Sequence, residues 1–300
     1  MISVSDFVQV VVTGVALGSI YTLMGKGLFI TFLTTKALNF GQGDFLMIAA
    51  FLGMSLMLAG VHPVVVFAAV FAVLILLALA LERIAIRPLQ KATAGSAGSL
   101  AWILTTLGFG MLLQNVVTLV WGKSRFFSPP LFGGGDKKVV TLFGAGFYAE
   151  ELLVAALALV AVGTLYYILF RTRIGKDIAA VSFDKDTASL LGINVRRTVM
   201  VSYALMGVLA GIAGVLAGPI TAVQSHMGML FIIKGFAVVS IGGFVNPLGI
   251  LIAGLAFGIV EGFSNYFDSR FGDLYPFVLV LVFLIVKPSG LFGEHRADVR

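Results

Sequence analysis

The segment Lys36–Gly53 reads KALNFGQGDFLMIAAFLG, an apolar run that opens with three polar side chains, Asn39, Gln42 and Asp44. Such groups are costly in lipid unless they meet a partner helix, a solute or a water-filled pathway. An Asp in the first turns of a helix is also favoured by the helix dipole and by free backbone N–H groups. A structural role at a helix start and a role beside a solute pathway are both open from these residues alone.

Three further ionisable residues interrupt apolar runs, namely Lys26, Lys234 and Glu261. A buried Lys could pair with Glu261 or Asp44, extend its ammonium to a lipid headgroup, or attract an anionic substrate. The sequence leaves these alternatives open.

Several kinds of chemistry are excluded or disfavoured. The chain has no Cys, which excludes disulfides and thiolate sites, and His62, His226 and His295 are scattered, so no metal site is predicted. No GxxxxGK[ST] motif is present, so ATP chemistry must come from another chain. The adjacent amides Gln114 and Asn115 are expected to hydrogen-bond between helices rather than to catalyse a reaction. We expect no enzymatic activity in this chain.

The composition identifies an integral membrane protein. Of 300 residues, 59% are hydrophobic and 11% are charged, with a mean hydropathy of +1.07, whereas soluble proteins carry about 25% charged residues. The net charge of +6 fits basic cytoplasmic loops better than nucleic-acid binding. The first residues, MISVSDF, lack the basic start of a cleaved signal peptide.

Charge-free runs predict the membrane spans, because a span needs about 20 mostly apolar residues. They indicate an all-α polytopic fold with eight or nine transmembrane helices, forming one transmembrane domain over residues 1–300. The expected segments are 6–33, 39–60, 64–81, 100–122, 152–170, 198–218, 234–245, 248–265 and 274–286.

Two longer polar segments separate these runs. Residues 123–151 are expected to form an extracytoplasmic loop or short interfacial structure, and 171–197 a charged cytoplasmic loop. The Asn246-Pro247 break leaves open whether 234–265 forms two spans or a pair of half-helices.

Positive charge predicts the orientation. Thirteen of the 20 Lys and Arg residues fall in four segments that can share one side of the membrane. The positive-inside rule then places the N-terminus outside and the C-terminus in the cytoplasm. The segments are Lys36, the loop from Arg83 to Lys91, the 171–197 loop, and the tail with Lys287, Arg296 and Arg300.

Glycines repeat at helical spacing on two segments. Such faces let helix backbones approach closely, and packing within one bundle is favoured over a dedicated dimer face. The two sets are Gly207, Gly211, Gly214 and Gly218, and Gly254, Gly258 and Gly262.

Long motifs in order along the chain resemble the LivH-type permeases of branched-chain amino-acid ABC importers. They are ITFLTTKALNF, ALNFGQGDFLMIAAFLG, ILTTLGFGMLLQNVVTLVWG, DKDTASLLGINVRRTVMVSYALMGVLAGIAGVLAG and IKGFAVVSIGGFVNPLGILIAGLAFGIVEG. The resemblance covers nearly the whole chain. It implies a multi-pass subunit of the bacterial inner membrane that pairs with a LivM-type permease, two ABC ATPases carrying ATP-Mg, and a periplasmic substrate-binding protein. No cofactor would be bound by this chain itself.

Within the 171–197 loop, DTASLLGIN resembles the family's coupling segment, a short amphipathic helix that would dock on an ATPase. Its apolar residues stand out in a charged loop, and its glycine would end the helix. A solvated loop with a chance apolar cluster is the alternative. The coupling residues are Asp186, Ala188, Leu190, Leu191, Gly192, Ile193 and Asn194.

For the substrate pathway, the expected residues are Asn39, Gln42, Asp44 and Lys26, with Gly242 and Gly243 as flexing points. Relatives often read NFGQGE where this chain reads NFGQGD, which keeps the acid. Lys26 stands where the family pattern suggests an apolar residue. We hypothesise that it favours a carboxylate-bearing substrate such as an aromatic or dicarboxylic acid.

Alternative functions remain open at this stage. One is a urea, short-chain amide or simple-sugar permease of the same superfamily. Another is an ion-gradient-driven secondary transporter in which Asp44 or Glu261 carries the proton; activity without ATP would distinguish it. A scaffold without a pathway is disfavoured, because polar residues inside the membrane are costly.

Overall fold

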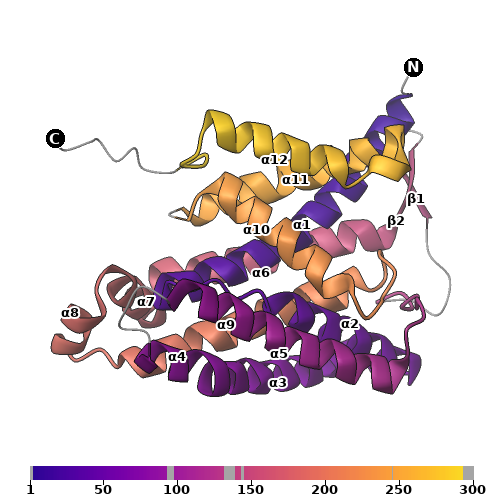
Figure 1. Ribbon diagram of the computed structural model, residues 1–300. Helices are drawn as coiled ribbons and strands as arrows, with labels where there is room; N and C mark the ends of the chain where they lie inside the picture. The colour runs from indigo at the N-terminus through magenta and orange to yellow at the C-terminus, as the bar shows by residue number, and fades with distance from the viewer. Residues whose placement is uncertain (1–2, 93–97, 132–138, 143–144, 245, 293–300) are drawn as a thin grey trace.

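The computed structural model describes residues 3–92, 98–131, 139–142, 145–244 and 246–292. Helices dominate this part of the chain (Figure 1). They are α1 (Val4–Thr35), α2 (Gln42–Leu58), α3 (Pro63–Leu81), η1 (Glu82–Ile86), α4 (Arg87–Ala92), α5 (Gly98–Trp121), α6 (Ala149–Arg171), α7 (Arg173–Phe183), α8 (Lys185–Leu190), α9 (Val195–Ala217), α10 (Met227–Gly242), α11 (Pro247–Phe267), η2 (Ser269–Phe271) and α12 (Leu274–Val286).

The apolar helices confirm the predicted polytopic all-α fold. Among the described residues, six helices are long and apolar enough to cross a membrane, and three shorter apolar helices accompany them. The six are Val4–Thr35, Pro63–Leu89, Ala101–Trp121, Ala149–Arg171, Val195–Ala217 and Pro247–Phe267; the shorter ones are α2, α10 and α12.

Local sequence signals explain where several helices begin and end. Ser3 and Asp6 form a capping box at the start of α1. Proline occupies the first position of both α3 and α11, where its missing N–H removes no helical hydrogen bond. The Asn246 side chain caps α11, and Gly243 ends α10 with φ of +87°, a conformation that glycine adopts freely.

Two predicted boundaries were wrong. Helix α2 begins at Gln42, so Asn39 lies before the helix and not within its first turn. Helix α10 begins at Met227, which places Lys234 in the middle of a helix instead of between two apolar segments. In both cases a polar residue was predicted to mark a helix boundary, because an unpaired polar group is costly in lipid. The sequence does not show the partners that such a residue meets inside the bundle.

The short helices α2 and α10 occupy similar places in two parts of the chain. Each follows a long helix, α1 or α9, and a connecting segment that turns back into the bundle, and each is followed after four residues by a helix that starts with proline. Helix α1 starts near the β-hairpin end, whereas α9 starts next to α8 at the opposite end (Figure 1). The two three-helix units therefore run in opposite directions.

Both glycine faces pack inside the chain, as predicted. Gly254 and Gly258 of α11 contact the backbone of Gly18 and Gly14 on α1, and Gly262 faces Val10. We call this contact the α1–α11 glycine seam. The other face covers neighbouring helices: Gly207 and Gly211 pack on α3, and Gly214 lies against the backbone of α2.

The polar segments lie at opposite ends of the bundle. Strands β1 (Val139–Leu142) and β2 (Ala145–Tyr148) form an antiparallel hairpin at one end, and α7 and α8 lie at the other (Figure 1). The hairpin agrees with the second alternative expected for 123–151, a short structure instead of a plain loop, and 171–197 contains two helices where one short helix was expected. Residues 132–138 and 143–144 of the first segment, and Arg296 and Arg300 of the tail, lie outside the described residues.

Candidate functional site

The segment before α2 carries its polar side chains into the bundle. Asn39 Oδ1 accepts a hydrogen bond of 3.1 Å from the Gly41 N–H, and Gln42 Nε2 donates one of 2.9 Å to the Met24 carbonyl of α1. Gly41 faces the Thr106 carbonyl so closely that a Cβ would lie 2.8 Å from it. Helix α2 therefore starts inside the bundle, beside α5.

Asp44 lies beside the middle of α5, where it meets Gln114. Gln114 Nε2 donates a hydrogen bond of 2.8 Å to Asp44 Oδ1, and Gln114 Oε1 lies 3.4 Å from His226 Nδ1. Asp44 is in the first turn of α2 and His226 immediately precedes α10. We call Asp44, Gln114 and His226 the Gln114 junction, because this one amide links the starts of both short helices.

The Gln114 junction is shaped by glycine. Gly43 of α2 and Gly228 of α10 meet backbone to backbone, and Gly110 of α5 leaves room for the Asp44 carboxylate. The positive ends of two helix dipoles meet at this point, which favours an anionic group such as the Asp44 carboxylate. Asn115, by contrast, bonds the Met111 carbonyl of its own helix and is exposed, so only Gln114 of the predicted amide pair links helices.

Three buried polar atoms near this region have no hydrogen-bond partner among the described residues. They are Lys26 Nζ, Asn39 Nδ2 and Gln42 Oε1. Lys26 is 1% exposed and forms no ion pair within the described part of the chain. The structure thus places Asn39, Gln42 and Asp44 around the start of α2, while Lys26 lies on α1, close in sequence to the Met24 carbonyl that Gln42 contacts.

Lys234 forms the centre of a buried ionic cluster. Its Nζ lies 2.8 Å from Glu261 Oε1 and 2.7 Å from Asp273 Oδ1. Tyr21 of α1 donates a hydrogen bond of 2.9 Å to Glu261 Oε1 and accepts one of 3.2 Å from Lys234. The Lys234 charge on α10 is therefore compensated by carboxylates on α11 and at the start of α12. We call Tyr21, Lys234, Glu261 and Asp273 the Lys234 cluster.

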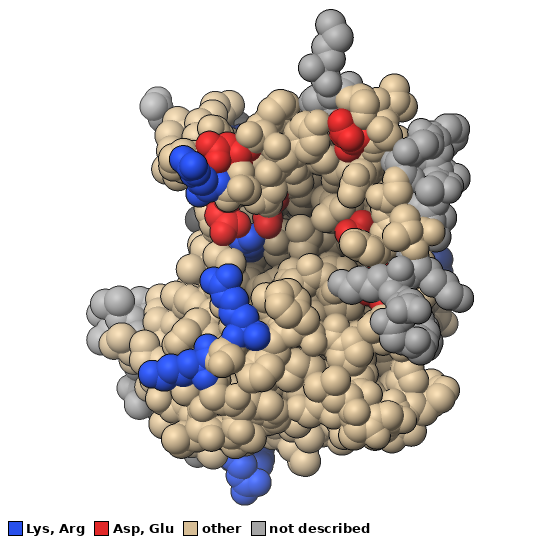
Figure 2. Space-filling view, turned by 90° about the vertical axis from the view of Figure 1, so that its right-hand side faces the viewer, with Lys and Arg blue, Asp and Glu red and all other residues tan. Residues whose placement is uncertain are grey.

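A cavity of about 510 Å³ borders the Lys234 cluster. Its lining includes Arg125 after α5 and Gln224 before α10 as well as Lys234, Glu261 and Asp273. Figure 2 shows acidic and basic side chains close together in the hollow of this face of the molecule.

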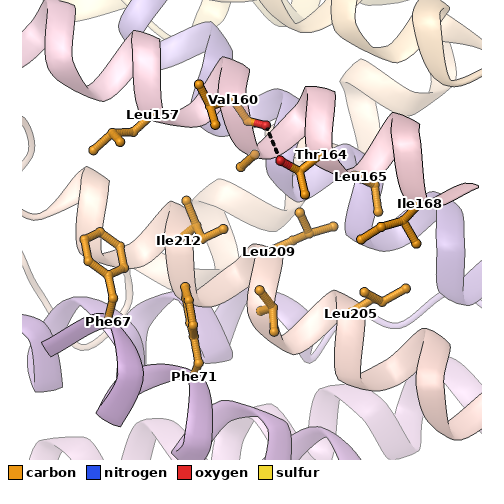
Figure 3. Close-up of a pocket in the computed structure, with 12 residues that line it drawn as sticks. Phe67, Phe71, Leu157, Val160, Thr164, Leu165, Ile168, Leu205, Leu209 and Ile212 are labelled. Carbon is orange, nitrogen blue, oxygen red and sulfur yellow. Dashed lines mark hydrogen bonds between the residues drawn. The ribbon is translucent and has the colours of Figure 1, made fainter. Parts of the chain in front are cut away.

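A second cavity, of about 330 Å³, differs in chemistry. It lies between α3, α6 and α9 and is lined by aliphatic side chains together with Phe67 and Phe71 (Figure 3). Its hydroxyl, Thr164 Oγ1, donates to the Val160 carbonyl of its own helix. This groove offers a polar solute nothing to bind and suits hydrocarbon.

The predicted coupling segment presents exposed apolar side chains. Leu190 is 89% exposed and Leu191 is 74% exposed, while Ala188 is buried against the body of the protein. Helix α8 ends before Gly192, whose φ of +82° favours glycine. The described residues thus contain a short helix at the predicted place, six residues long.

Both ends of this segment are capped. The Asp184 side chain accepts a hydrogen bond from Thr187 N–H at the start of α8. Hydrogen bonding with the Thr187 side chain, and then with its backbone N–H, lowers the pKa of the Asp184 carboxyl. Asn194 Oδ1 accepts from Arg197 N–H and starts α9. Because only residues 191–194 separate α8 from α9, the two helices are closely tethered.

Gly242 and Gly243 lie at the end of α10, as the Asn246-Pro247 break indicated. Gly242 packs against the backbone of Gly249, and the Ile241 carbonyl accepts a hydrogen bond of 2.7 Å from Leu291 N–H. The end of α10 is therefore held by α11 and by the segment after α12.

Comparison with known proteins gives a consistent result. A family model described as "Branched-chain amino acid transport system / permease component" matches residues 10–287. The permease protein LivH of the high-affinity branched-chain amino acid transport system of Escherichia coli K12 is 29% identical, with 97% of each chain covered. BraD of Pseudomonas aeruginosa, described as a permease protein of the same kind of system, is 26% identical, with 99% of each covered. PsaBC from Streptococcus pneumoniae in complex with Fab shares the fold, with a TM-score of 0.50 at 14% identity over 93% of this chain and 89% of that chain.

Proposed function

Because the chain belongs to the family of branched-chain amino acid transport permease components, we propose that it is the permease subunit of an ATP-driven importer for branched-chain amino acids or a related small carboxylate or amide. The observation that carries this proposal is the family match over residues 10–287, almost the whole multi-pass chain.

The importer requires partners. We expect a LivM-type permease to complete the pathway, two ABC ATPases to hydrolyse ATP, and a periplasmic binding protein to deliver the substrate. Two observations support ATPase docking at α8: the sequence has no phosphate-binding loop, and Leu190 and Leu191 are exposed at the end of the bundle. Exposed apolar side chains in a charged segment are typical of an interaction surface.

The orientation follows from the positive-inside rule. The end with α7 and α8 is cytoplasmic and the β-hairpin end is extracytoplasmic, in a bacterial inner membrane. Docking of the ATPases requires α8 to be on the cytoplasmic side, so the two arguments agree.

In this reading, the pathway passes the Gln114 junction. Asp44 and the unpartnered polar atoms of Asn39 and Gln42 offer hydrogen bonds to a polar solute inside the membrane. ATP binding and hydrolysis move α8, and with it α9, which packs on α1, α2 and α3. Flexing of the α10–α11 connection at Gly242 and Gly243 would have to break the contacts that hold the end of α10 to Gly249 and Leu291.

Uptake into proteoliposomes tests the proposal. The chain is reconstituted with its candidate partners, and labelled branched-chain, aromatic and amide substrates are supplied with or without ATP. We expect ATP-dependent uptake that falls about tenfold or more in a Leu190→Glu, Leu191→Glu double variant, because charge in an apolar docking site removes central contacts. Ser189→Glu on the same helix, where Ser189 is also exposed, is the matched control.

One result would contradict the proposal. Uptake by the isolated chain under a proton gradient, without ATP, would rule out an ATP-driven importer and support a secondary transporter. Asp44 and Glu261 would then be the residues to change.

A further inference from the structure

Faces of three helices meet at the cavity beside the Lys234 cluster. The lining residues of each helix are spaced three or four apart, so each set lies on one side of its helix. They are Leu17 and Tyr21 of α1, Met227, Leu230, Phe231 and Lys234 of α10, and Glu261 and Asn265 of α11.

The cavity is lined by groups that can bind a cation and by groups that can bind an anion. Lys234 already pairs with Glu261 and Asp273, but Glu261 Oε2 is buried and has no hydrogen-bond partner among the described residues. The side chain of Asp273 is 52% exposed, so it can also bind a solute. Arg125 lines the cavity and forms no ion pair within the described part of the chain. A buried acceptor and a cation are both available to a ligand.

Part of the remaining wall is apolar. Met227 and Phe231 are buried, and Leu230 and Leu17 complete this apolar part, whereas Thr221, Gln224 and Asn265 add polar side chains elsewhere in the lining. An aliphatic side chain can leave water at the apolar part of the wall.

We propose that this cavity binds the ammonium and carboxylate groups of an apolar α-amino acid. Glu261 and Asp273 hold the ammonium, Arg125 holds the carboxylate, and the side chain lies against Met227 and Phe231. This inference rests on the proposed function and narrows its substrate class to zwitterions. It also assigns substrate recognition to residues away from the Gln114 junction.

The position of the cavity fits entry of the substrate. Arg125 and Gln224 belong to segments joined by a bridge between Phe126 and Val223, just beyond the end of α5. This is the β-hairpin end of the bundle, which the proposed orientation makes extracytoplasmic. The cavity is thus placed to receive substrate from the binding protein before it reaches the Gln114 junction.

Equilibrium binding tests the inference directly. The assembled importer, without its binding protein, is placed in nanodiscs and titrated with labelled leucine. Two competitors separate the charges: the matching α-keto acid lacks the ammonium, and isopentylamine lacks the carboxylate. We expect unlabelled valine and isoleucine to compete and both single-charge analogues to compete at least about tenfold less well, since each loses one charge-assisted contact.

Variants with matched controls assign the contacts. Arg125→Gln and Asp273→Asn are each expected to weaken leucine binding about 10- to 100-fold. Arg270→Gln, at an exposed residue, and Asp268→Asn, at a half-buried one, make the same changes nearby on residues that do not line the cavity, and they are expected to leave binding unchanged. Arg125 lies outside the Lys234 cluster, so its variant tests the site without disturbing buried ion pairs.

The outcomes separate this inference from the proposed function. Leucine binding that survives both cavity variants, or that the single-charge analogues displace as well as valine does, overturns the site. Absence of leucine binding in an importer that still performs ATP-driven uptake also overturns it and leaves the proposed function standing. If the unmodified importer performs no ATP-driven uptake, the proposed function is contradicted instead, whatever the binding result.

Discussion

Two lysines among the described residues are buried, and their surroundings differ completely. Lys234 is 4% exposed and pairs with two carboxylates and a tyrosine hydroxyl. Lys26 is 1% exposed, and its Nζ has no hydrogen-bond partner among the described residues. An ammonium group needs compensation in a dry interior, so the desolvation cost of Lys234 is offset by its partners, whereas that of Lys26 is not. Residues kept at such a cost are candidates for function.

The largest expected effect is on Lys234. Lys234→Met leaves the buried Glu261 carboxylate without its cation, and removing one partner of a buried pair costs about 3–5 kcal/mol. The free energy of unfolding in detergent, measured by denaturant titration, should fall by that amount. Lys176→Met makes the same change at an exposed position of α7. Its free energy of unfolding should differ from that of the unmodified chain by no more than about 0.5 kcal/mol.

The double variant Lys234→Met, Glu261→Gln sharpens this result. Because it removes both members of the pair, we expect it to be more stable than Lys234→Met alone. A double variant that loses the sum of the two single losses would show that the pair does not interact.

A smaller loss is expected for Glu261→Gln. The amide oxygen can still accept from Tyr21 and Lys234, and Asp273 still compensates the Lys234 charge. The loss should be about 1–3 kcal/mol, the range for hydrogen bonds to charged groups. Thermal unfolding followed by circular dichroism measures it, and a loss equal to that of Lys234→Met would contradict the role of Asp273.

Tyr21→Phe should cost less again. It removes one hydroxyl that bridges Lys234 and Glu261 but leaves their direct contact. We expect a loss of about 1 kcal/mol in the same unfolding measurement. No loss at all would mean that the hydroxyl adds nothing to the Lys234 cluster.

Lys26→Met should cause no loss of stability, because it removes a buried ammonium group that has no hydrogen-bond partner among the described residues. The unfolding temperature should stay the same or rise. Its effect should appear in transport: if Lys26 favours a carboxylate-bearing substrate, uptake of aromatic and dicarboxylic acids should decrease relative to neutral amides. Unchanged substrate preference and rate would contradict that hypothesis.

The comparison of the two lysines also shows which features of the fold could be predicted from the sequence. Apolar runs predicted the helices, and the Asn246-Pro247 break was confirmed, because these signals are local. The start of α10 was missed because Lys234 looked like a boundary, while its partners Glu261 and Asp273 follow 27 and 39 residues later. Pairing across helices leaves no local signal.

The candidate site was only partly predictable. Asn39, Gln42 and Asp44 stood out as polar residues in an apolar run, and the structure gathers them at the start of α2. His226 did not stand out, because an isolated histidine carries no spacing that links it to Gln114. The cavity at Arg125 depends on three helix faces that only the folded chain brings together.

The α1–α11 glycine seam has a mechanical consequence. Where Gly14 and Gly18 meet Gly258 and Gly254, backbone touches backbone, and the Thr22 side chain faces Gly254. A sliding motion there would have to break the backbone contact itself. We therefore expect the two helices to move as one rigid unit, so that Tyr21 and Glu261, one on each helix, keep a constant separation.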